Sequence, residues 1–292
     1  LTQQRMEHRF RLRIDRQARS EVLAFCAGGV GNSLGYYFNY NSDNFVIGKL
    51  LGSASLGFYN LAYQLTNTLT NILAQALGDL GMASFAQIAD DRQQEKTLVQ
   101  VVEHTAFLAA PVYVILSLML DPQVVAIVFG SHWVPICAVI PWLMFYAYTR
   151  LVNLAMIAVL NAKGRPQITA KVNLAIAPIA AFAFFFVAPR GNILGVSVVV
   201  ALLLGIVWTL LTWWAGCHAL KWSIGKFLLA CFKPVGFALL AGSLAVMLPT
   251  LLKPIAFLAV YLLLVRLLAA AQFCEYQALF RRFTQRLSVY RP

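Results

Sequence analysis

Polar side chains recur at helical spacing inside apolar parts of this chain. Two sets lie three and four residues apart: Asn32, Tyr36, Asn39 and Asp43 in one segment, and Asn60, Gln64, Asn67, Asn71 and Gln75 in another. Such spacing places the side chains of a helix on one face. Polar groups in hydrocarbon are costly unless they pair or meet water. The matching faces therefore predict a shared hydrated cavity, and hydrogen bonding between helices is the alternative.

A third apolar segment carries Tyr146, Arg150 and Asn153 on one face. Burial of an arginine costs about 2.5–3.5 kcal/mol on insertion scales, so its presence needs a reason. A guanidinium binds phosphate oxygens two at a time, which favours an anion site, such as one for a lipid diphosphate. The alternatives are an ion pair with Glu103 or Asp79, or a side chain that extends to the membrane interface.

The substrate-cavity residues predicted from these three faces come from three helices. They are Asn32, Tyr36, Asn39, Asp43, Gln64, Asn67, Asn71, Tyr146, Arg150 and Asn153. Asp43 either faces this cavity or caps the end of a helix.

Motifs typical of enzymes and metal sites are missing from the sequence. There is no Gly-x-Ser-x-Gly, no glycine-rich phosphate loop with a lysine, and no pair of carboxylates on one face. The five cysteines form no CxxC pair, and no Cys/His cluster has the spacing of metal ligands. We expect no catalytic residues, no metal and no cofactor. The Gly31–Gly35 step predicts close packing between helices.

The composition indicates that the helices with these polar faces lie in a membrane. Hydrophobic residues make up 60% of the chain, charged residues only 12%, and the mean hydropathy is +0.72. A helix needs about 20 apolar residues to cross a bilayer, and the chain supplies such segments repeatedly. We predict an all-α membrane protein with about eight transmembrane helices. The expected segments are 21–42, 59–82, 98–120, 134–161, 167–188, 193–216, 234–251 and 254–273.

The basic residues indicate the orientation of these segments. The net charge is +12, and most of the 23 Lys and Arg residues fall between alternate segments and at the two ends. Only Lys49, Arg190 and Lys253 fall in the connecting loops on the opposite side of the membrane. This bias places both termini in the cytoplasm. Because the charges flank apolar segments, we expect anionic lipid head groups as partners and no nucleic acid.

A series of short motifs follows the same order as in one family of membrane proteins. The stretch from Asp43 to Ala62 reads DNFVIGKLLGSASLGFYNLA, and later stretches read FGSHW at 129–133, AKGR at 162–165 and ILGV at 193–196. Together they resemble the polysaccharide transporter family, the Wzx-type flippases of O-antigen, capsule and exopolysaccharide precursors within the MOP superfamily. The resemblance covers about residues 10–220.

The resemblance implies a fold of two six-helix lobes plus two further helices. In this chain, residues 1–20 would be a basic cytoplasmic segment between the lobes, and 21–216 the second lobe. Residues 217–273 would hold an interfacial helix and the two additional transmembrane helices, before a basic cytoplasmic tail at 274–292. The first lobe would then lie outside this chain.

The resemblance also implies a function in the bacterial cytoplasmic membrane. Such a protein flips polyprenyl-diphosphate-linked oligosaccharides by alternating access, with H⁺ or Na⁺ as the coupling ion and with other polysaccharide-assembly proteins as partners. Arg150 would meet the diphosphate, and the Asn and Tyr side chains would meet the sugars. Three alternatives remain: a drug or metabolite exporter of the same superfamily, a membrane-embedded polysaccharide polymerase or ligase, and an assembly module. The short outer segments, whose one histidine is His132, disfavour the polymerase or ligase.

Overall fold

The computed structural model describes residues 16–85, 90–249 and 252–269, and these residues form helices and no strand. The long helices are α1 (Arg16–Leu50), α2 (Gly52–Phe85), α3 (Asp91–Met119), α5 (Ile140–Ala162), α6 (Pro166–Val199), α7 (Trp208–Leu220), α8 (Ile224–Ala245) and α9 (Lys253–Leu268). Three short elements connect them: α4 (Pro122–Val128), the 3₁₀ segment η1 (Ser131–Ala138) and the π-helical segment η2 (Val200–Val207). The predicted all-α class is confirmed.

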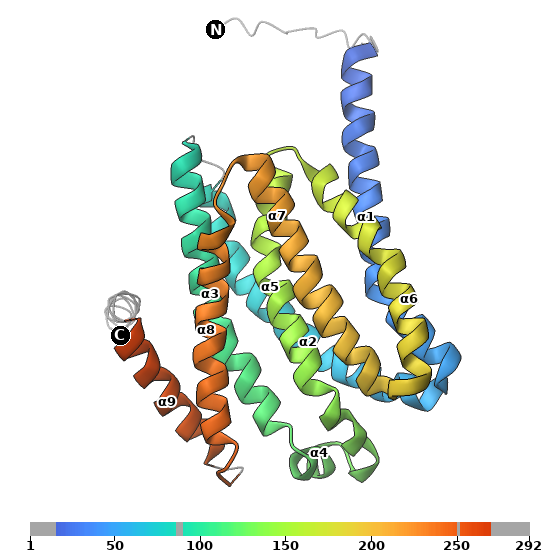
Figure 1. Cartoon of the computed structure of the whole chain (residues 1–292), viewed down its shortest axis with the longest axis vertical. Helices are drawn as coiled ribbons and strands as arrows, with labels where there is room; N and C mark the ends of the chain where they lie inside the picture. Colours follow the sequence, from blue (N-terminus) through green and yellow to red (C-terminus); the bar gives the residue numbers. More distant parts are fainter. Residues whose placement is uncertain (1–15, 86–89, 250–251, 270–292) are drawn as a thin grey trace, which may run out of the picture.

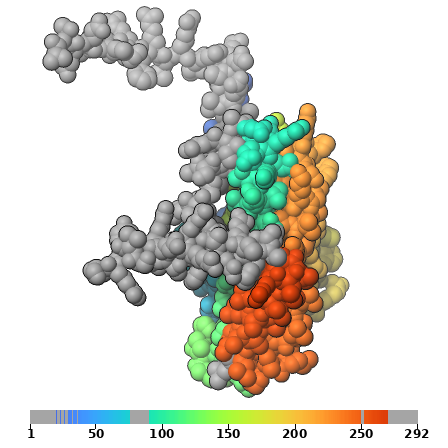
Figure 2. All heavy atoms as spheres, turned by 90° about the vertical axis from the view of Figure 1, so that its left-hand side faces the viewer, coloured from blue at the N-terminus to red at the C-terminus, as the bar shows by residue number. Residues whose placement is uncertain are grey.

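Helix α5 is the central element of the bundle. It contacts α2, α3, α6, α7 and η2 (Figure 1), and Leu151, Val152, Met156 and Leu160 are almost completely buried. Helix α3 packs along α8. Helix α9 contacts both of them and lies on the outside of the bundle (Figure 2). Because α5 contacts all these elements, most of the side chains in its middle are buried by other helices.

Helices α1 and α6 pack closely along one another (Figure 1). A Cβ added to Gly35 would lie 2.8 Å from the Cβ of Asn173, and one added to Gly31 would lie 3.6 Å from Cδ1 of Leu174. Only glycine allows the backbones to approach this far at position 35. The close packing predicted from the Gly31–Gly35 step is confirmed.

The chain reverses direction inside the long helical run from α6 to α7. Asn192 has φ 53° and ψ −154°, which is not helical, and the two legs on either side of it pack against each other. Figure 1 shows the turn at the lower right of the bundle. The sequence predicted separate segments at 167–188 and 193–216, and the reversal at Asn192 separates two legs that cover the same residues.

Four helical segments among the described residues are long and apolar enough to cross a membrane. They are Asp91–Met119, Ile140–Ala162, Pro166–Leu220 and Ile224–Ala245. Helices α1 and α2 are longer than most of these but carry many amide and hydroxyl side chains, and α9 has 16 residues. The eight transmembrane helices predicted from the sequence are not confirmed by this criterion.

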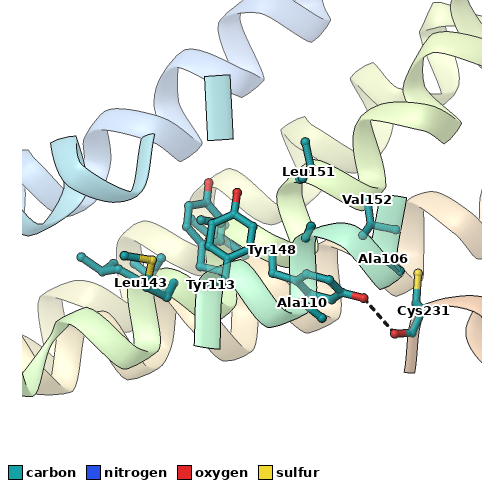
Figure 3. Packing of buried hydrophobic residues seen from close by; sticks show 14 of the residues in the cluster. Ala106, Ala110, Tyr113, Leu143, Tyr148, Leu151, Val152 and Cys231 are labelled. Carbon is teal, nitrogen blue, oxygen red and sulfur yellow. Dashed lines mark hydrogen bonds between the residues drawn. The ribbon is translucent and has the colours of Figure 1, made fainter. Parts of the chain in front are cut away.

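The stretch between the predicted segments 193–216 and 234–251, where an interfacial helix was expected, is not a separate helix. Helix α7 continues to Leu220, and α8 begins at Ile224 and runs through Pro234. A proline inside a helix disturbs the hydrogen bonds of the preceding turn. There the backbone oxygen of Cys231 accepts a hydrogen bond of 2.8 Å from the Tyr148 hydroxyl of α5 (Figure 3). This bond ties α5 to the turn of α8 before Pro234, where the sequence pattern predicts a break.

Tyr261 makes the same kind of contact with α3. Pro111 lies inside α3, and a proline leaves the carbonyl four residues earlier without its helical donor. That carbonyl belongs to Phe107, and its oxygen accepts a hydrogen bond of 2.9 Å from the Tyr261 hydroxyl of α9. Helix α9 is thereby attached to the proline-containing turn of α3.

Candidate functional site

Arg150 is buried in the middle of α5, with 6% of its surface exposed. Its Nη1 donates a hydrogen bond of 2.7 Å to Oδ1 of Asn67 in α2 and one of 3.4 Å to the Tyr40 hydroxyl of α1. The guanidinium carbon lies 5.4 Å from the centre of the Tyr40 ring, within cation–π range. Arg150 therefore joins α1, α2 and α5 inside the bundle, which does not fit a side chain extended to the membrane interface.

The two partners of Arg150 also hold each other. The Nδ2 group of Asn67 donates a hydrogen bond to the Tyr40 hydroxyl, while its Oδ1 accepts from Arg150. The Asn67 amide thus uses its donor on one neighbour and its acceptor on the other. Asn67 and Tyr40 are both neutral and together fix the position of the guanidinium.

Tyr40 also belongs to a cluster of tyrosines around this site. Its ring meets Tyr63 edge to face at 5.3 Å, and Tyr63 lies 5.7 Å from Tyr59 and 6.3 Å from Tyr146. Tyr40 is not among the cavity residues predicted from the sequence. The signal was present, because Tyr40 follows Tyr36 by four residues and so lies on the same helix face.

The polar face of α2 is exposed on either side of Asn67. Gln64 and Asn71 lie one turn before and one turn after it, and both are exposed. Asn60 and Gln75, further along the same face, are exposed as well. Buried Arg150 therefore lies next to a row of open amide side chains.

Asn153 and Asn39 have different surroundings from this row. Asn153, one turn after Arg150, is fully buried, and neither its Nδ2 nor its Oδ1 has a hydrogen-bond partner. Asn39 points to α6, where its Nδ2 donates to the backbone oxygen of Asn173 at 3.2 Å. The side chain of Asn173 accepts in turn from Trp208 Nε1 at 2.6 Å. For Asn39, the structure shows the interhelical hydrogen bond that was the alternative to a cavity.

Asp43 lies inside α1 and is 1% exposed, so it does not cap a helix end. Its carboxylate accepts a hydrogen bond of 2.6 Å from the Tyr59 hydroxyl of α2. Asn32 and Tyr36 belong to α1, but their side chains lie outside the described part of the chain, as does that of Asp79. Of the predicted residues, the structure thus joins Arg150 directly to Asn67.

Other features of the described residues give no second centre of this kind. No group of three or more His, Cys, Asp or Glu side chains in this part of the chain is arranged to hold a metal ion. A groove of about 550 Å³ lies between α3, α5 and α8, and mostly apolar side chains line it. The Arg150 network is therefore the candidate functional site.

Comparisons with known proteins agree with the motifs in the sequence. A family model described as "Polysaccharide biosynthesis protein" matches residues 1–138, which include Tyr40 and Asn67 but end before Arg150. The chain is similar to "Lipopolysaccharide biosynthesis protein WzxC" of Escherichia coli K12, with 30% identity over 157 residues. It is also similar to "Teichuronic acid biosynthesis protein TuaB" of Bacillus subtilis 168, with 22% identity over 221 residues.

These similarities cover only part of the longer proteins. The match to WzxC covers 52% of this chain and 31% of WzxC, and the match to TuaB covers 75% of this chain and 45% of TuaB. No solved structure matches the chain. The matches show that part of the chain is similar to polysaccharide biosynthesis proteins, and the apolar helices are those of a multi-pass helical membrane protein.

Proposed function

We propose that this chain is part of a flippase that moves polyprenyl-diphosphate-linked oligosaccharides across the bacterial cytoplasmic membrane by alternating access. The observation that supports it best is a buried arginine, hydrogen-bonded to Asn67, beside an exposed polar helix face. The names of the relatives place them in the synthesis of surface polysaccharides. The proposed role is transport, with no catalytic step by the chain itself.

Arg150 has the chemistry to receive the diphosphate. A diphosphate cannot cross hydrocarbon without compensation of its charge, and the guanidinium offers several donors in a planar fork. Asn67 Oδ1 occupies one of these donors at 2.7 Å. A phosphate oxygen would displace this neutral acceptor, because a hydrogen bond between two charged groups is stronger.

The exposed amides of α2 suit the sugar part of the substrate. Gln64 and Asn71 lie on either side of Asn67 and have open side chains. An amide side chain both donates and accepts hydrogen bonds, as a sugar hydroxyl does. The amides could therefore bind hydroxyls of many different sugars. The apolar polyprenyl chain would remain in the lipid.

The wider architecture of the proposal comes from the sequence. The charge bias and the motif series support eight transmembrane helices with both ends in the cytoplasm, arranged as a second transporter lobe plus two further helices. Lipids, the lipid-linked oligosaccharide and other proteins of polysaccharide assembly are the proposed partners.

A genetic experiment tests the role and the site together. Deletion of the gene is expected to cause accumulation of lipid-linked oligosaccharide on the inner leaflet and loss of surface polymer. We expect complementation to fail with Arg150→Ala and to be partial with Arg150→Lys, which keeps the charge but not the fork of donors. Arg266→Ala is the matched control, because Arg266 is exposed on α9.

Two results would contradict the proposal at different levels. Normal surface polymer in the deletion strain would exclude the flippase role. Full transport by both Arg150 variants would exclude the anion site while leaving the role of the protein in place.

A further inference from the structure

Asp43 is a buried carboxylate, and its contacts among the described residues are to neutral groups. One carboxylate oxygen accepts the hydroxyl of Tyr59 at 2.6 Å, and the other accepts the backbone amide of Asn44 at 2.8 Å. No Lys, Arg or His among the described residues lies within 4.0 Å of it. A charge this deep is costly unless it is paired or neutralised, so Asp43 calls for an explanation.

The pairing with Tyr59 suits both protonation states of the acid. A tyrosine hydroxyl donates to an ionised carboxylate, and it accepts from a protonated one. A proton from water can therefore add to a carboxylate oxygen and leave again without any change of partner. No bond between heavier atoms forms or breaks in this exchange.

In the described part of the chain, the titratable groups found to interact with Asp43 are phenols. Tyr59 and Tyr63 of α2 interact with Asp43 directly, and both also interact with Tyr146 of α5 and Tyr40 of α1. Helix α6, the other element packed against α1, meets it nearby through Asn39 and Asn173, which do not titrate. At physiological pH these phenols are neutral, so Asp43 is the group among them that can change charge.

Buried oxygen atoms without partners lie on both sides of Asp43 in the sequence. These atoms are Ser42 Oγ and Asn44 Oδ1. Such atoms are commonly satisfied by ordered water. Asp43 also lies seven residues before the end of α1 at Leu50, which corresponds to about 10 Å along the helix. The proton site proposed below requires water to cover about this distance from the end of α1.

We propose that Asp43 is a proton-binding site within the α1–α2 hairpin, with the hydroxyl of Tyr59 as its switching hydrogen-bond partner. Protonation reverses the polarity of the one side-chain hydrogen bond between Asp43 and α2. Ring contacts continue from Tyr59 through Tyr63 to Tyr40, which holds Arg150. If the proposed flippase role holds, this is the site at which a proton gradient acts on transport.

Infrared difference spectroscopy of the full-length protein in lipid vesicles tests the site directly. A titration should show the carbonyl stretch of a buried, protonated carboxyl group, and Asp43→Asn should remove that band. Asn keeps an oxygen that accepts from Tyr59, so the contact between α1 and α2 survives. Asp91→Asn is the matched control, because the side chain of Asp91 is 75% exposed, and it should keep the band. An unchanged band in Asp43→Asn, or no such band in the wild type, would overturn the proposal.

A second measurement separates this site from the proposed function. Vesicles with the full-length protein and a polyprenyl-diphosphate oligosaccharide are compared with and without a pH gradient. The wild type should respond to the gradient, and Asp43→Asn should transport at one rate in both conditions. An equal response of the two proteins would overturn the link to transport. If the wild type moves no substrate, the flippase role fails while the infrared result still decides the proton site.

Discussion

At the scale of single residues, the proposed anion site depends on how Tyr40 and Asn67 hold Arg150. They fix the guanidinium through two hydrogen bonds and a ring contact, and neither carries a charge. The sequence identified Arg150 and Asn67, because an arginine and a row of amides inside apolar segments are unusual. It could not show that Asn39 points to α6, since spacing defines a helix face but not the helix that this face meets.

Tyr40 should therefore affect substrate affinity through both its hydroxyl and its ring. Tyr40→Phe removes the acceptor for Arg150, and one hydrogen bond contributes about 0.5–1.5 kcal/mol, so affinity should fall roughly 2- to 10-fold. Tyr40→Leu also removes the ring contact, which contributes about 2 kcal/mol more where the cation is desolvated, as buried Arg150 is. The substrate concentration at half-maximal transport measures both effects. The control is Tyr37→Leu, since Tyr37 is 63% exposed on the same helix. Wild-type affinity in Tyr40→Leu would contradict this role.

At the scale of helices, the sequence predicted most elements, but several boundaries differ from the structure, most of all the start of α8. The apolar runs predicted helices close to α3, α5 and the two legs of α6 and α7, and the Gly31–Gly35 step predicted close packing. The sequence could not show that α8 starts at Ile224 and passes through Pro234. In the turn before Pro234, Cys231 is bonded by Tyr148 of α5, which lies 83 residues away in the chain. Local sequence patterns do not reveal a contact between residues so far apart.

The close packing of α1 on α6 leads to a matched pair of glycine variants. At Gly35 an added methyl group meets Asn173 at 2.8 Å, and the backbone of α6 is also close, at 3.1 Å. Gly35→Ala should therefore destabilise the protein by about 1–3 kcal/mol, as overpacking generally does. At Gly29 nothing lies within 4 Å, so Gly29→Ala should stabilise α1 by about 0.5–1 kcal/mol. Thermal unfolding in detergent measures both. Equal shifts of the two midpoints would show that α1 and α6 do not pack as described.

At the scale of the whole molecule, the account depends on water next to the polar face of α2. Buried Arg150 can receive a diphosphate only if an aqueous passage leads to it. Gln64 and Asn71 would line that passage, whereas Ile72, at a similar depth and 59% exposed, would face lipid. The sequence predicted the polar face, but not which exposed face of the bundle meets water, because every helix here also has exposed apolar residues.

Labelling with a charged maleimide tests this central claim most directly. Single cysteines replace Gln64, Asn71 or Ile72 in the full-length protein without its native cysteines, and the reagent is applied to intact membranes from either side. A maleimide reacts with the thiolate, which forms in water and not in hydrocarbon. The account predicts rapid labelling at positions 64 and 71 and very slow labelling at 72. Equally slow labelling at all three positions would show that the polar face of α2 meets no water, and would contradict the account.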